Sequence, residues 1–207
     1  MPGRRRACAR PFAAPAQGSV QCAKRVPKGV LRSGQCLAHP PAIDACIAAV
    51  DYAYPWEALI TRFKFHANPG LAGALAALMR KADAAAQLLA AADAVLPVPL
   101  SAERLRQRGY NQALLLARAL ARPKVQPRWL RRTHDTLAQS SLNRTERLRN
   151  LRGAFAVSTQ IPRDLGGQPL LLVDDVMTNG ATVHAAASAL RQAGATSVSA
   201  LVLARTP

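Results

Sequence analysis

The sequence predicts an α/β protein built on a doubly wound parallel sheet, and three observations support this. Segments with strand character alternate with helical segments of roughly 10 to 20 residues, the order typical of βαβ units. Residues 170–173 form an unbroken apolar run, as expected of a strand buried on both faces of a sheet. Half of the 207 residues are hydrophobic, which suffices for a core in one domain with a small appendage.

The predicted elements follow one another at short intervals. Pro55 opens the first helix, Ser101 caps a later one, and Gly194 ends the last. Strands are expected at 47–54, 94–99, 125–130, 170–173 and 197–203, and helices from 55, at 71–91, at 101–121 and at 182–193. Short helical stretches are expected in the polar, basic segment 133–150. Gly109 lies inside a predicted helix, where glycine is unfavourable, and therefore favours a bend or a close contact.

Residues 1–42 are rich in Pro, Arg and Gly, show no periodicity, and predict a loop-rich leader before a domain at 43–207. The four cysteines have irregular spacing, which does not indicate a disulfide framework. We therefore expect reduced thiols and a cytoplasmic location. No apolar run of about 20 residues exists, so no membrane span is predicted.

The net charge is +17, and arginine greatly outnumbers lysine. Such a field attracts polyanions, either nucleic acid or phosphorylated small molecules. An arginine-rich proteome would account for part of this excess. Trp129 lies in a basic stretch, where it either stacks on a base or belongs to the core.

The most informative segment is the apolar strand that ends in Asp174 and Asp175, with a small polar turn and a helix behind it. Ligands bind open α/β sheets at the carboxyl ends of strands. Two carboxylates can accept hydrogen bonds from the vicinal hydroxyls of a ribose. Backbone N–H groups of the turn and the helix N-terminus would bind an anion, and Gly180 permits a close backbone approach. The segment therefore predicts a site for a phosphorylated sugar.

This segment resembles the phosphoribosyl-pyrophosphate (PRPP) motif of the type I phosphoribosyltransferases. By that resemblance, Asp174 and Asp175 are the catalytic carboxylates that bind ribose. The phosphate-binding stretch would comprise Val176, Met177, Thr178, Asn179, Gly180, Ala181 and Thr182. The alternative is a buried strand whose aspartates merely cap a helix. The sequence has no G-x-x-x-x-G-K-[ST] loop and no G-x-G-x-x-G, which argues against P-loop and dinucleotide folds.

Further motifs, above all Arg108-Gly109-Tyr110-Asn111-Gln112, resemble the ComF (competence protein F) family within this type I branch. The resemblance implies a role in DNA uptake and natural transformation, with an unknown acceptor substrate. It also implies that Val98, Pro99, Arg104 and Arg108 face pyrophosphate or a DNA phosphate; a solvated helix face is the alternative for the two arginines. Lys64 either reaches a phosphate or is a surface lysine.

ComF proteins commonly carry two C-x-x-C pairs that bind zinc, whereas each pair here retains one cysteine, Cys22 and Cys36. The leader is thus a degenerate zinc-finger-like segment, and no zinc is expected. Mg²⁺ is expected to accompany PRPP, bridging ribose and pyrophosphate oxygens, with no metal ligand assigned to the protein.

Three functions remain open. The first is a phosphoribosyltransferase-like protein that uses PRPP or a related phosphorylated ribose. The second is a competence factor that binds single-stranded DNA, with a sensory or vestigial PRPP site, working with the DNA-uptake machinery. The third is a regulator that binds PRPP without turnover. The sequence leaves the oligomeric state open.

Overall fold

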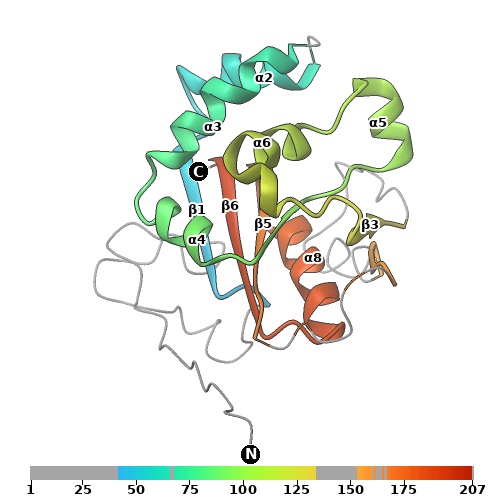
Figure 1. Ribbon diagram of the computed structural model, residues 1–207. Coiled ribbons are helices and arrows are strands. Elements are labelled where there is room, and N and C mark those ends of the chain that lie inside the picture. Colours follow the sequence, from blue (N-terminus) through green and yellow to red (C-terminus); the bar gives the residue numbers. More distant parts are fainter. Residues whose placement is uncertain are drawn as a thin grey trace, which may run out of the picture.

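The computed structural model describes residues 42–65, 68–133, 153–159, 161, 165 and 167–206 (Figure 1). Its centre is a parallel sheet of four strands in the order β1-β6-β5-β2. The strands are β1 (Ala45–Asp51), β2 (Ala94–Pro97), β5 (Pro169–Met177) and β6 (Ser197–Arg205). This arrangement confirms the predicted α/β class with a parallel sheet. The leader prediction lies outside the described residues, apart from residue 42.

The two inner strands, β5 and β6, form the centre of the core. They pair in parallel over their whole length, with Leu172 opposite Ala200. Every residue from Leu170 to Val173 is buried. Strands covered on both faces carry continuous apolar runs, which explains why residues 170–173 were recognisable in the sequence.

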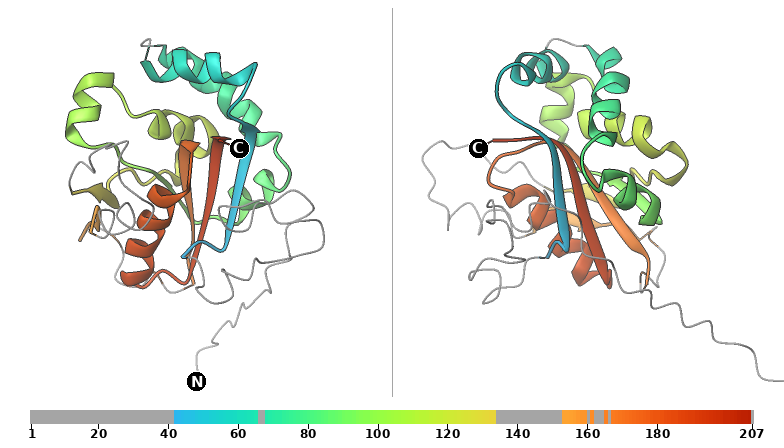
Figure 2. Two further views of the ribbon diagram at one scale, coloured as in Figure 1. Left: turned by 180° about the vertical axis from the view of Figure 1, so that it is seen from behind. Right: turned by 90° about the vertical axis from the view of Figure 1, so that its left-hand side faces the viewer.

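In the described part of the chain, six α-helices accompany the sheet. They are α2 (Trp56–Phe65), α3 (Ala72–Arg80), α4 (Ala85–Ala91), α5 (Ala102–Arg108), α6 (Gln112–Ala121) and α8 (Ala181–Gln192). Side chains of α8 pack on one face of the sheet, against Leu170 and Leu172. Side chains of α2, α3, α4 and α6 pack on the other face, against Leu171 and Val173. The right-hand view of Figure 2 shows helices on both sides of the sheet, which is therefore doubly wound.

Two segments predicted as single helices are each broken in two. The segment predicted at 71–91 breaks between α3 and α4, where Ala84 adopts a left-handed φ of 61°. Alanine is a strong helix former, so propensity did not indicate this break; tertiary packing overrides it. The segment predicted at 101–121 breaks at Gly109, whose φ is 76°. This second break agrees with the bend that Gly109 indicated.

Replacing Gly109 by alanine should destabilise the protein by about 1 to 2 kcal/mol. A Cβ at this position meets no heavy atom within 4 Å, so the penalty comes from the left-handed backbone. Gly73→Ala is the matched control, because its Cβ also meets no atom within 4 Å and its backbone is helical. That control should raise stability by up to about 1 kcal/mol. Urea unfolding measures both changes, and an equal effect at the two positions would contradict the strain argument.

A small antiparallel pair lies outside the main sheet. It consists of β3 (Leu130–Arg132) and β4 (Phe155–Val157), with Arg131 opposite Ala156. The strand predicted at 125–130 is largely wrong: Arg122–Lys124 forms a 3-10 turn and Val125 makes a single bridge to Val95. Pro123 and Pro127 lack the N–H that a ladder needs. The helical stretches predicted at 133–150 lie almost wholly outside the described residues.

Trp129 is partly buried and packs against the core cluster on the α8 face, which favours the core alternative for this side chain. Within the described residues, no helix combines the length and the apolar character needed to cross a membrane.

Candidate functional site

The carboxyl end of β5 is the centre of the candidate site. Pairing between β2 and β5 ends at Pro97 opposite Val173. Beyond that point β5 continues beside β6 as far as Met177. The strand was predicted to end at residue 173, whereas β5 continues through Asp174, Asp175 and Val176. The acidic pair therefore lies where β5 has lost one of its two neighbours.

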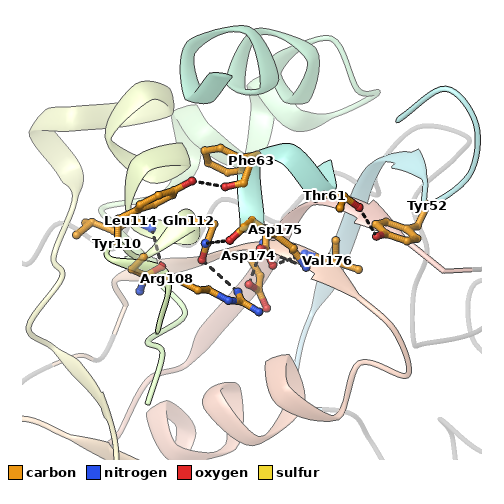
Figure 3. Close-up of polar contacts among 12 residues, drawn as sticks. Tyr52, Thr61, Phe63, Arg108, Tyr110, Gln112, Leu114, Asp174, Asp175 and Val176 are labelled. Atoms are coloured by element: carbon orange, nitrogen blue, oxygen red, sulfur yellow. Dashed lines mark hydrogen bonds and ion pairs between the residues drawn. The ribbon is translucent and has the colours of Figure 1, made fainter. Parts of the chain in front are cut away.

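The two aspartates face opposite sides of the sheet. Side chains alternate along a strand, so Asp174 shares the face of Leu172 and Asp175 that of Val173. The α8 side receives Leu172, and the α2 and α6 side receives Val173. Figure 3 places the pair at the centre of the surrounding polar contacts. The two carboxyl groups are nevertheless close enough for the negative charge of Asp175 to act on Asp174.

Asp175 is buried and ion-paired. Its Oδ2 lies 3.3 Å from Nζ of Lys64 in α2, and the side chains are 11% and 14% exposed, respectively. Its Oδ1 accepts a hydrogen bond of 2.7 Å from the N–H of Val176. Within the described part of the chain Oδ2 accepts no hydrogen bond, so its contact with Lys64 is one of charge. Asp175 Oδ1 is thus hydrogen-bonded within the protein, and Oδ2 has the Lys64 ammonium as its charged neighbour.

Asp174 is only partly buried, and its environment disfavours the charged form. Burial, and then the negative charge of Asp175, raise the pKa of Asp174 to about 8. The Lys64 ammonium acts in the opposite direction and lowers this pKa. Asp174 Oδ1 accepts a hydrogen bond of 2.8 Å from the N–H of Asp175. A carboxyl group in this state gains most from a ligand that brings hydrogen-bond donors or positive charge.

The turn behind β5 leads directly into α8. Thr178 and Asn179 are exposed, and Gly180 adopts the left-handed conformation with φ 75°. Asn179 Oδ1 accepts a hydrogen bond of 3.1 Å from the N–H of Ala181. The N–H groups of Thr182 and Val183, also in the first turn of α8, have no acceptor within the helix by its geometry. Such groups suit an anion.

The R-G-Y-N-Q motif forms the bend between α5 and α6 and reaches the end of α2 (Figure 3). The Tyr110 hydroxyl donates to the carbonyl oxygen of Phe63. Gln112 Nε2 donates to the carbonyl oxygen of Lys64 at 3.3 Å. Its Oε1 accepts a hydrogen bond of 3.3 Å from Arg108 Nη1. Side chains of the motif therefore hold the helix that carries Lys64.

The segment after β2 is already partly engaged. Val98 donates its N–H to Val173 at 2.9 Å, and its carbonyl oxygen accepts from Asn111 Nδ2 at 3.1 Å. Pro99 has no N–H. Free backbone donors for a pyrophosphate can therefore begin only at Leu100, while Arg104 and Arg108 are partly buried on α5. The roles assigned to all these residues stay predictions.

Sequence reasoning missed the Lys64 ion pair and the hydrogen bonds of Tyr110 and Gln112. The partners are far apart in sequence, so no local pattern reports them. The one available signal was Lys64 between two phenylalanines, of which Phe63 is buried and Phe65 is exposed. That pattern is compatible with a surface lysine as well as with an ion pair.

Among the described residues, no group of three or more His, Cys, Asp or Glu side chains forms a metal site. Cys46 is buried, and burial raises the pKa of its thiol to about 12. The zinc prediction concerns Cys22 and Cys36, which lie outside the described residues, as do residues 134–152 of the basic segment.

A doubly wound parallel sheet, with an acidic strand that runs through a glycine turn into a helix, is consistent with a type I phosphoribosyltransferase-like fold. No family model matches the sequence. The chain is 34% identical over 193 residues to the DNA utilization protein YhgH of Escherichia coli O6:H1, covering 90% of this chain and 83% of the relative. Competence protein F of Haemophilus influenzae is 33% identical over 178 residues, covering 83% and 77%. Competence protein ComFC of Bacillus subtilis is 39% identical over 112 residues, covering 54% and 44%. The chain belongs to the ComF family.

Proposed function

We propose that this protein binds PRPP, or a related phosphorylated ribose, and acts as a phosphoribosyltransferase-like protein in DNA uptake. One observation supports the ligand above all others: the half-buried Asp174 is followed six residues later by the left-handed Gly180, which directly precedes the first turn of α8. A carboxylate for hydroxyls and free N–H groups for a phosphate thus lie on consecutive parts of one strand-turn-helix unit.

The proposed roles follow the chain. Asp174 binds the ribose hydroxyls, and Asp175 supports it from the other face through Lys64. The turn and helix start, at 176–182, bind the 5-phosphate mainly with backbone N–H groups. Arg104 and Arg108, whose guanidinium groups pair with phosphate oxygens in two-point contacts, face the pyrophosphate. The segment at Val98 and Pro99 provides the wall behind it.

Mg²⁺ is proposed to arrive with PRPP, and phosphate and water oxygens, which it prefers, would hold it without a protein ligand. Bound there, the ion would neutralise charge on the pyrophosphate leaving group. The protein's own contribution is to orient the sugar and to place negative charge near C1. As the acceptor bonds to C1, the C1–O bond breaks and its electron pair leaves with pyrophosphate. Positive charge that develops on the sugar would be stabilised by Asp174 in its ionised form.

The acceptor is left open, and a PRPP-binding regulator without turnover remains compatible with the same site. The link to DNA rests on the relatives, which are named a DNA utilization protein and competence proteins. We propose that this chain works with the DNA-uptake machinery in the cytoplasm, where its thiols would stay reduced.

Isothermal titration with PRPP and Mg²⁺ tests the proposed site directly. We expect saturable binding by the full chain and a loss of at least tenfold in affinity for Asp174→Ala, because the variant cannot accept hydrogen bonds from the sugar hydroxyls. Asp83→Ala, at an exposed position between α3 and α4, is the control and should bind like the unsubstituted protein. No heat with PRPP, or equal binding by both variants, would overturn the assignment.

A second candidate, binding of single-stranded DNA, is favoured by the net charge of +17. Electrostatic binding to nucleic acid weakens steeply with salt. If DNA affinity falls steeply with salt but is equal in Asp174→Ala, and PRPP gives no heat, the protein is a binding module rather than a PRPP protein.

A further inference from the structure

The end of α2 is tied to the α5–α6 bend by hydrogen bonds to its main chain. The last carbonyl groups of a helix have no donor within the helix and need one from elsewhere. At α2, the Tyr110 hydroxyl serves the carbonyl of Phe63, and Gln112 Nε2 serves that of Lys64 at 3.3 Å. Gln112 is almost completely buried, so this bond is shielded from water. The main chain at Lys64 is therefore held from outside the helix.

Ring contacts hold the residues on both sides of Lys64. The Phe63 and Tyr110 ring centroids lie 6.0 Å apart. The Arg108 guanidinium lies 5.0 Å from the centre of the Phe65 ring, within the range of a cation–π contact. Arg108 also donates to Gln112 Oε1 at 3.3 Å. One short motif thus contacts three consecutive residues of α2.

The side chain between these anchors is the one that meets the acidic strand. Lys64 Nζ lies 3.3 Å from Asp175 Oδ2, and little of either side chain is exposed. A lysine side chain loses much conformational freedom when it is held in one place. Fixing the main chain on both sides of Lys64 limits where its ammonium can lie.

We propose that Tyr110 and Gln112 are positioning residues that hold the Lys64 ammonium against Asp175. Asp175 is then kept occupied by the protein, and Asp174 is the carboxylate left open to a ligand. The second half of this inference rests on the proposed PRPP site, and the first half does not. The R-G-Y-N-Q motif at residues 108–112 would thereby act on the candidate site indirectly, through α2.

Competitive labelling with an amine-reactive reagent tests the first half without any ligand. In the unsubstituted protein, Lys64 should react at least tenfold more slowly than Lys81, which is exposed. Tyr110→Phe, which removes only the hydroxyl, should raise the labelling rate of Lys64 several-fold and leave that of Lys81 unchanged. Gln112→Leu should have the same effect, and it provides a second variant if one of them folds poorly. Mass spectrometry of the peptides gives the ratios.

Arg80→Gln is the matched control, because it also removes a side chain that donates to helix-end carbonyls. Arg80 of α3 donates to the carbonyls of Ala119 and Leu120 in α6, away from Lys64. If Tyr110 acts only on general stability, Arg80→Gln will raise Lys64 labelling equally, and the inference is overturned. Unchanged labelling of Lys64 in both Tyr110→Phe and Gln112→Leu would also overturn it.

Titration of the same variants with PRPP and Mg²⁺ tests the second half. We expect about tenfold weaker binding by Tyr110→Phe and unchanged binding by Arg80→Gln. If the unsubstituted protein binds no PRPP, the proposed function fails while the labelling result still decides the positioning role. If it binds PRPP and Tyr110→Phe binds equally well despite faster labelling, Lys64 is positioned but does not serve the ligand site.

Discussion

Asp174→Asn should be increasingly more stable than the unsubstituted protein as the pH rises from 4 to 8. The pKa of Asp174 is raised from 3.8 to about 8 by burial and by the charge of Asp175. Between these values the folded state binds a proton that the unfolded state has lost, so the stability of the unsubstituted protein falls with rising pH. Linkage between protonation and folding limits the fall in unfolding free energy to about 1.4 kcal/mol per pH unit. Because Asp174 is partly accessible to water, the slope should be smaller than this limit.

Urea unfolding at several pH values measures this effect. The relevant quantity is the difference in unfolding free energy between Asp174→Asn and the unsubstituted protein, because other groups titrate equally in both. Asp83→Asn, at an exposed site, should give a difference that does not vary with pH. If the Asp174→Asn difference were also constant, the carboxyl group would be ionised throughout, and the ligand-free site would carry two negative charges.

Lys64→Met should lower the unfolding free energy by about 3 to 5 kcal/mol at pH 7, the usual penalty for removing one partner of a buried ion pair. The substitution keeps an apolar stem of similar length but leaves the Asp175 carboxylate without its cation. Adding Asp175→Asn should recover most of the loss, because the second substitution removes the uncompensated charge. Chemical denaturation of the three variants gives the coupling between the two side chains.

Lys124→Met is the control for that experiment. Lys124 Nζ donates to the carbonyl oxygens of Leu89 and Ala90, both at 3.0 Å, so its partners are neutral. Lys124→Met should lower the unfolding free energy by only about 1 kcal/mol, the net value of an ordinary hydrogen bond. Equal losses at Lys64 and Lys124 would mean that water screens the Lys64–Asp175 pair, and the double variant would then show no recovery.

The sheet was predictable from the sequence because its inner strands carry an unmistakable pattern. Residues 170–173 are continuously apolar, and the structure buries them on both faces. Helix boundaries were harder to predict where the amino-acid composition is uniform. Alanine-rich sequence around Ala84 favours a helix at every position, so only packing decides where α3 ends and α4 begins. Gly109 was readable because glycine has a specific backbone role.

The candidate site was predictable in its residues but not in its geometry. Asp174 and Asp175 were identified by their place after an apolar run, yet the strand continues to Met177. Val176 and Met177 are apolar, which in retrospect permits that continuation, although Val176 packs on the α2 and α6 side and Met177 on the α8 side, so regular alternation ends after Asp175. The pairing of Asp175 with Lys64 spans more than a hundred residues. It depends on where α2 lies relative to β5, which no local pattern specifies.

Because Asp174 and Asp175 face opposite sides of the sheet, substitutions at the two positions have different consequences. Asp175 is fitted to one particular lysine, so a change there must be matched by a change in a distant helix. Asp174 has no ion-pair partner among the described residues, and its chemistry can be altered while the architecture around α2 stays intact. An engineer who wishes to retune what this sheet edge recognises should therefore vary the first acid and leave the second alone.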